Sequence, residues 1–175
     1  MLKRALAVLA LAASPLAAQG TSASPVGTAR MLWEDVTGYL VQSAQDMPAE
    51  KYGYKPTPAV RSFGEIIGHV AGSQEMFCAV ALGEKPPAED AVEKTAKSKE
   101  ALIAALKASN DRCQKAYAMS EETAAAMTDV FGGRQSKLYV LIVNTTHDNE
   151  HYGNLVTYLR MNGMVPPSSR PRARS

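Results

Sequence analysis

Three histidines are the residues of this chain whose types and spacing could support metal chemistry. Two of them, His147 and His151, lie four residues apart in the stretch NTTHDNEHYGN. On an α-helix this spacing places both side chains on one face, one turn apart, where two imidazole nitrogens can bind one divalent ion at about 2.0 to 2.1 Å. Two polar residues that share a solvated helix face would show the same spacing. The pair alone therefore leaves both interpretations open.

A third ligand would have to come from His69, which lies on the apolar face of another predicted helix. A buried imidazole needs either a metal or a hydrogen-bond partner, and the sequence allows both. Three neutral ligands would leave the ion its full charge and an open coordination position, an arrangement typical of catalytic sites. Asn144 and Ser73 each lie one turn from a histidine and could hydrogen-bond a ligand or a substrate. The neighbouring carboxylates, Asp148 and Glu150, are expected to face solvent.

Hydrophobic periodicity predicts the helices that must position these residues. Four long segments are predicted, at residues 28–47, 62–82, 98–120 and 136–162. Two local signals mark their ends: a capping box at the start of the second helix, and a left-handed glycine after the last. These signals are Ser62 with Glu65, and Gly163. The expected apolar stripes include Leu32 in the first helix and Ile142 in the last.

The connections favour a helical bundle. Residues 84–96 are charged and irregular, which predicts a long crossover connection between the second and third helices. Residues 121–127 are expected to form a short extra turn, and residues 131–134 a tight turn. No segment alternates with a period of two for long enough to require a strand. The sequence therefore predicts an all-α fold, a four-helix bundle with a long crossover connection, over residues 28–169.

The N-terminal residues 1–18 have the pattern of a secretory signal peptide: two cations, Lys3 and Arg4, then an apolar run, then small residues. A buried N-terminal helix and a retained membrane anchor are the alternatives. Removing this segment leaves equal numbers of cationic and anionic residues, which speaks against a nucleic-acid partner. We therefore expect a periplasmic or secreted protein without a stable membrane span, with a flexible leader at 19–27 and a disordered basic tail at 170–175.

The chain has two cysteines, Cys78 and Cys113. In an oxidising compartment such a pair indicates a disulfide. Closing the loop between the two cysteines would stabilise the folded protein by roughly 3 to 4 kcal/mol. Two buried free thiols are the alternative.

Two segments resemble the DinB/YfiT-like family. KYGYKPTPAVRSFGEIIGHVAGSQ is similar to that family's second helix and its approach, and THDNEHYGNLVTYLRMNGMVPPSS is similar to its final helix. The resemblance implies a four-helix bundle that holds a divalent metal through three histidines, here His69, His147 and His151. Zinc or nickel is the first expectation, with manganese, iron and cobalt as alternatives. Glu150 departs from the pattern, because many relatives carry a histidine there.

Better-understood relatives transfer or rearrange adducts of low-molecular-weight thiols in the cytosol, whereas residues 1–18 of this chain have the pattern of an export signal. We therefore expect an exported, metal-dependent hydrolase or transferase whose small-molecule substrate the sequence does not identify. A non-catalytic bundle that binds a metal or a small ligand is the alternative, and a structural bundle with hydrogen-bonded histidines is a third. Whether the protein forms a homodimer stays open.

Overall fold

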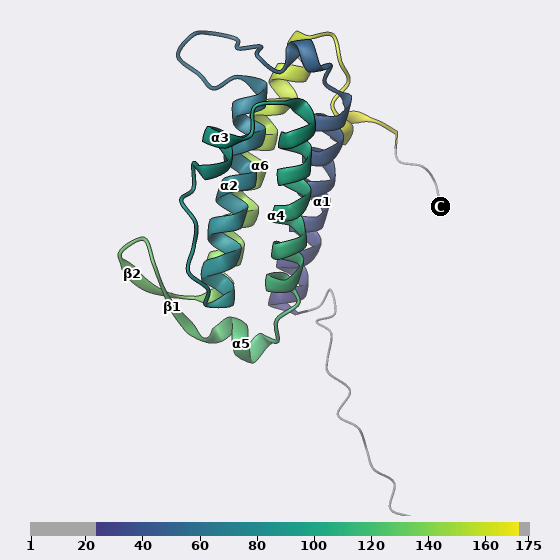
Figure 1. Cartoon of the computed structure of the whole chain (residues 1–175). Coiled ribbons are helices and arrows are strands. Elements are labelled where there is room, and N and C mark those ends of the chain that lie inside the picture. Colours follow the sequence, from purple (N-terminus) through teal and green to yellow (C-terminus); the bar gives the residue numbers. More distant parts are fainter. Residues whose placement is uncertain (1–23, 172–175) are drawn as a thin grey trace, which may run out of the picture.

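The computed structural model describes residues 24–171, most of which belong to four long helices (Figure 1). These are α1 (Pro25–Asp46), α2 (Phe63–Leu82), α4 (Lys99–Tyr117) and α6 (Lys137–Met161). They contact one another in the cyclic order α1, α4, α2, α6. Helices α1 and α6 run in one direction, and α2 and α4 run in the other. The predicted all-α four-helix bundle is confirmed, and none of the helices between residues 24 and 171 has the length and apolarity to cross a membrane.

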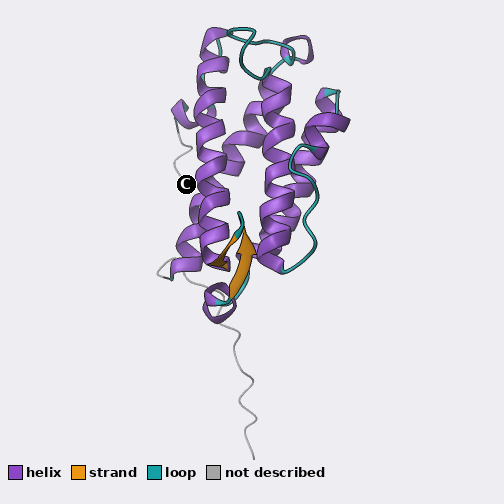
Figure 2. Cartoon of the chain, turned by 90° about the vertical axis from the view of Figure 1, so that its left-hand side faces the viewer, coloured by secondary structure: helices purple, strands orange, loops and turns teal. Residues whose placement is uncertain are grey.

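Because α2 and α4 are parallel, the chain must return along the bundle between them. Residues 83–98, here called the crossover strap, make this return along the outside of α2 and include the short helix α3 (Ala91–Thr95) (Figures 1 and 2). The strap lies very close to α2 because two glycines face it. A Cβ atom on Gly72 would lie 2.0 Å from the carbonyl oxygen of Glu89, and one on Gly68 would lie 2.9 Å from the Cα of Glu93.

Serine begins each of the four long helices and also α5 (Glu121–Ala125). In each case the hydroxyl accepts a hydrogen bond from a backbone N–H of the first turn, which would otherwise lack a partner. The capping box of Ser62 and Glu65 is present, with its reciprocal bonds at 3.2 and 2.6 Å. Gly163 has a φ of 74° and follows the end of α6, as predicted.

The first helix begins earlier than expected. The predicted flexible leader includes residues 24–27, but α1 starts at Pro25, where Ser24 caps it. Val26 is buried, and its N–H donates to the carboxylate of Glu121 at 3.0 Å. The predicted signal peptide lies outside the described residues. At the other end, Arg170 of the predicted tail pairs with Asp46 at 2.5 Å.

A small hairpin precedes α6, where the sequence had indicated a turn but no strand. Strands β1 (Met127–Val130) and β2 (Gly133–Ser136) pair antiparallel around Phe131 and Gly132, whose φ angles are 52° and 75°. Positive φ at both central residues matches the tight turns that join two strands. The strands are four residues long and none of their residues is fully buried, so they are too short and too exposed to show a clear alternating apolar pattern.

The core consists of two apolar clusters with a polar layer between them. One cluster gathers around Leu40, Phe63, Leu106 and Leu155, and the other around Trp33 and its neighbours. Every long helix contributes buried polar side chains to the layer between them: Thr37, Ser73, Gln74, Ser109, Asn144 and Asp148. In this layer Gln74 accepts from the Trp33 indole at 2.9 Å and donates to Ser109 at 3.2 Å.

Two residues of the expected stripes face solvent instead: Leu32 is 54% exposed and Ile142 is 47% exposed. On α1 the buried positions include Trp33, Val36 and Leu40, so the buried stripe passes through the residue after Leu32. In the second cluster the Trp33 ring stacks on Tyr117 with centroids 4.6 Å apart. The hydrophobic periodicity therefore located the helices, but it did not show which residues at the edge of an apolar stripe are buried.

The predicted disulfide between Cys78 and Cys113 is formed, with the two Cα atoms 5.1 Å apart. It joins α2 to α4 inside the second apolar cluster. The loop that it closes contains the whole crossover strap.

Candidate metal centre

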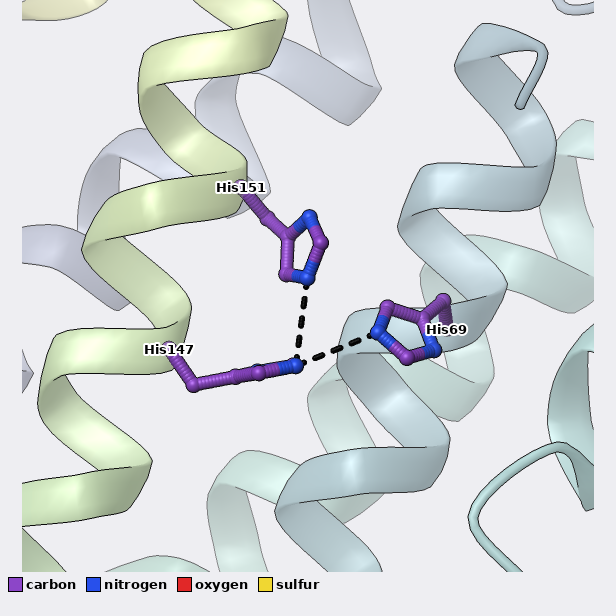
Figure 3. Close-up of side chains that lie close together, drawn as sticks. All are labelled: His69, His147 and His151. Carbon is purple, nitrogen blue, oxygen red and sulfur yellow. Dashed lines mark hydrogen bonds between the residues drawn. The ribbon is translucent and has the colours of Figure 1, made fainter. Parts of the chain in front are cut away.

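The three histidines converge between α2 and α6, at one edge of the polar layer (Figure 3). The Nε2 atom of His147 lies 3.1 Å from the Nε2 of His69 and 3.1 Å from the Nε2 of His151. The ligand atoms of all three lie within 4.8 Å of one another. His69 is 7% exposed and His151 is 9% exposed, while His147 is partly buried. Residues 78 positions apart in the sequence therefore present their ring nitrogens to one point.

The surroundings favour the neutral form of each ring, which is the form that binds a metal. Burial lowers the pKa of His69 and of His147, and nearby Arg61 lowers both further. For His151, burial and the adjacent His147 lower the pKa to about 4. The cluster is thus neutral near pH 7, with lone pairs available on its nitrogens.

This arrangement fits a cation better than it fits hydrogen bonding alone. A hydrogen bond between two Nε2 atoms requires a proton on one of them. If His147 carries that proton, its single N–H must serve the lone pairs of both His69 and His151. A cation would satisfy all three. The two spacings of 3.1 Å are also close to the roughly 3.3 Å that separates two nitrogen ligands of a tetrahedral ion bound at about 2.0 to 2.1 Å.

Two carboxylates of the crossover strap flank His69. Glu89 Oε1 lies 3.8 Å from His69 Nε2, and Glu93 Oε2 lies 3.9 Å from His69 Nδ1. Glu93 also accepts a hydrogen bond from Arg61 at 3.1 Å. These groups are not predictable from the sequence pattern, because they lie about twenty residues from His69 in an irregular segment. The pair Gly68 and Gly72 on α2 was the available signal, since small residues beside a ligand allow another backbone to approach closely.

The two polar helpers expected from the sequence have different partners. Ser73 donates to Glu89 at 3.0 Å, so it reaches the cluster through that carboxylate. Asn144 donates to the hydroxyl of Tyr117 at 3.1 Å inside the polar layer, and no hydrogen bond joins it to a histidine among residues 24–171. Asn154, one turn beyond Glu150, places its amide 3.5 Å from His151 Nδ1.

The expectation that Asp148 faces solvent is wrong. Its side chain is fully buried, and neither oxygen has a hydrogen-bond partner in the described part of the chain. Burial raises the pKa of this carboxyl well above its usual range. Successive residues are rotated by about 100° around the helix axis, and here this rotation turns Asp148 toward the core. Asp148 lies on the same buried face of α6 as Leu141, Asn144 and Thr145. Glu150 is exposed, as expected.

An open pocket of about 740 Å³ adjoins the cluster. His151 lines it on α6 together with Asn154 and Tyr158, and the segment before α2 forms the opposite wall. Arg61 on that wall is fixed by its ion pair with Glu93 and by the hydroxyl of Tyr158, which donates to the Arg61 carbonyl at 2.6 Å. The pocket gives a small molecule a route to one ligand of the cluster.

Solved structures with the same fold are similar to this chain at low sequence identity. A DinB-like protein from Bacillus cereus ATCC 10987 matches with a TM-score of 0.70 and 16% identity, covering 81% of this chain and 95% of that one. A putative DinB-family member from Exiguobacterium sibiricum 255-15 matches with a TM-score of 0.63 and 17% identity, covering 80% and 93%.

A mycothiol-dependent maleylpyruvate isomerase matches with a TM-score of 0.63 and 16% identity. The match covers 76% of this chain but 60% of the isomerase, so the chain spans less than two thirds of that protein. No curated protein matches the sequence. The family model of the DinB superfamily matches residues 32–155, which is more than half of the chain and includes all three histidines. The protein therefore belongs to the DinB superfamily.

Proposed function

We propose that this DinB-superfamily protein is an exported, metal-dependent hydrolase or transferase whose divalent ion is held by His69, His147 and His151. The observation that carries the proposal is the convergence of three neutral imidazoles, two buried and one partly buried, with Nε2 atoms 3.1 Å apart in two of the three pairs. Three neutral nitrogen donors suit zinc or nickel, and manganese, iron or cobalt can use the same donors.

A divalent ion in such a site supplies positive charge to a substrate oxygen or sulfur at its open position. The chain's own residues supply the rest. His69 comes from α2 and His147 and His151 from α6, so the packing of two rigid helices sets the ligand spacing. The pocket beside His151 admits the substrate, and Arg61 and Tyr158 fix one wall of that pocket.

Two observations support export. Residues 1–18 carry the pattern of a signal peptide, and the Cys78–Cys113 disulfide is the kind of bond that persists in an oxidising compartment. The intact mass of protein recovered from the periplasm tests this part of the proposal. We expect the mass of a chain cut near Ala18, and an uncut chain in the cytoplasm would contradict it.

The test of the metal site is elemental analysis of the chain without residues 1–18, combined with thermal unfolding. We expect about one divalent ion per chain, and a rise in melting temperature on addition of that ion that a chelator reverses. His69→Ala, His147→Ala and His151→Ala should each abolish this rise. Thr146→Ala changes an exposed neighbour on α6 and should keep it. Wild-type protein that binds none of the five metals would refute the proposal.

A second candidate function is a non-catalytic bundle that binds a metal or a small ligand. The comparison with the isomerase supports this second candidate, because this chain matches 60% of that enzyme's length and leaves the rest of that chain unmatched. Turnover of esters, amides and thiol conjugates by the metal-loaded protein separates the two. Activity that His147→Ala removes supports the enzyme, whereas tight metal binding without turnover of any panel member supports the binding module.

A further inference from the structure

The carboxylate nearest to a ligand atom of the histidine cluster belongs to the crossover strap. Glu89 Oε1 lies 3.8 Å from His69 Nε2, which is the same ring nitrogen that faces His147. The Glu89 side chain is 45% exposed while that of His69 is 9% exposed, so the carboxylate lies where the buried cluster meets solvent.

The fold holds Glu89 in this position from two directions. The Ser73 hydroxyl, one turn after His69 on α2, donates to Glu89 Oε1 at 3.0 Å. The Glu89 backbone lies directly on Gly72, where even a methyl group would come within 2.0 Å of its carbonyl oxygen. A side chain on a surface connection would ordinarily be free to move, but this one is anchored through both its backbone and its carboxylate.

The distance distinguishes two roles for this carboxylate. Two ligands of a tetrahedral ion bound at about 2.0 to 2.1 Å lie roughly 3.3 Å apart, and Glu89 is farther than that from His69. Glu89 is also absent from the set of residues whose ligand atoms are all mutually close. It therefore lies beside His69 and outside the set of three histidines whose ligand atoms are mutually close.

We propose that Glu89 is a further residue of the metal centre, which accepts a hydrogen bond from the O–H, N–H or S–H group bound at the open position, with Ser73 and Gly72 holding it there. This inference rests on the proposed function, because it requires a metal at the three histidines. It assigns a role to the crossover strap: the connection delivers one acceptor to a site otherwise built from α2 and α6. A substrate that retains a proton on its metal-binding atom is the class that this acceptor favours.

Two readouts that do not depend on turnover test the proposal: the affinity for Zn²⁺ measured by competition with a chelator, and the visible spectrum of the Co²⁺-loaded protein. Glu89→Gln should weaken Zn²⁺ binding by about tenfold or more, the usual effect of losing a group that supports a metal site, and should alter the Co²⁺ spectrum. Ser73→Ala should shift both readouts in the same direction by less, since it removes only the anchor.

The matched control is Glu150→Gln. Glu150 is exposed on α6, and its charge also acts on His147 and His151, but no contact places its carboxylate at a ligand atom among the described residues. This variant should stay within about twofold of wild type in Zn²⁺ affinity and keep its Co²⁺ spectrum. Thermal unfolding of each variant without metal checks that the bundle is intact.

Three outcomes would overturn the inference. If Glu89→Gln binds Zn²⁺ as wild type does and keeps the spectrum, the carboxylate does not act at the open position. If Glu150→Gln changes both readouts as much as Glu89→Gln does, the effect is one of net charge. If wild-type protein binds no metal, the proposed function is refuted and the role of Glu89 with it. If wild-type protein binds Zn²⁺ but Glu89→Gln changes neither readout, only the role of Glu89 is refuted.

Discussion

Replacing Gly72 with alanine tests the close packing of the crossover strap on α2. The added Cβ would lie 2.0 Å from the Glu89 carbonyl oxygen, where ordinary contacts begin near 3.4 Å. The strap would have to move away from α2 by about 1.4 Å, the difference between these two distances. The neighbouring atom belongs to the backbone, so it cannot relax by a change of rotamer.

The size and sign of the effect follow from two opposing contributions. Overpacking of a buried site typically costs about 1 to 3 kcal/mol, whereas glycine to alanine inside a helix gains up to about 1 kcal/mol. We therefore expect Gly72→Ala to lower the free energy of unfolding by roughly 1 to 2 kcal/mol. For a domain of this size that corresponds to a fall in melting temperature of about 2 to 8 °C.

Gly38 provides the matched control, since it lies inside α1 with nothing within 4 Å of an added Cβ. Gly38→Ala should therefore raise the free energy of unfolding by about 0.5 to 1 kcal/mol. Urea denaturation of the metal-free proteins measures both changes, with the slope of the transition checked for constancy. Opposite signs for the two substitutions are the expected result. A Gly72→Ala variant as stable as Gly38→Ala would refute the close approach of the strap.

Three further changes affect stability. Replacing Cys78 and Cys113 together with alanine should cost about 3 to 4 kcal/mol in chemical denaturation, because the disulfide closes a loop of 35 residues, and an unchanged midpoint would contradict this. Asp148→Asn should stabilise the metal-free protein at pH 7 by about 1 kcal/mol or more. Burial raises the folded-state pKa of Asp148, so the carboxyl costs the folded protein stability as pH rises above about 4. The gain from the substitution should therefore vanish near pH 4 in the same denaturation experiment. His151 has a folded-state pKa of about 4, below its ordinary 6.5, so wild type should lose stability as pH falls from 6.5 to 4, and His151→Gln should lose less in urea titrations across this range.

Signals in the sequence were sufficient to predict the four long helices, though not the first residues of α1. The capping box at Ser62 and the left-handed Gly163 act through their own backbone neighbours, so they could be predicted without knowledge of the fold. The positions where this failed depend on tertiary packing. Leu32 and Ile142 are apolar residues at the edge of a stripe, and the arrangement of neighbouring helices decides which edge is covered.

The candidate site could be predicted only in part for a related reason. His147 and His151 share a helix, so their spacing was informative, while the approach of His69 depended on a helix nearly eighty residues away. Glu89 was not predicted, because nothing in an irregular, charged segment indicates which carboxylate will lie against Gly72. The burial of Asp148 was missed because angles measured from His147 do not say on which side the core lies.

The disulfide has a consequence for what limited proteolysis would do to this protein. Lys94 and Lys97 lie in the strap, between the two bridged cysteines. Trypsin that cuts after one of them divides the polypeptide, with His69 on one fragment and His147 and His151 on the other. The fragments would remain one molecule through the Cys78–Cys113 bond alone and would separate on a denaturing gel only after reduction. A single sulfur–sulfur bond would then be the only covalent link between the two halves of the histidine cluster.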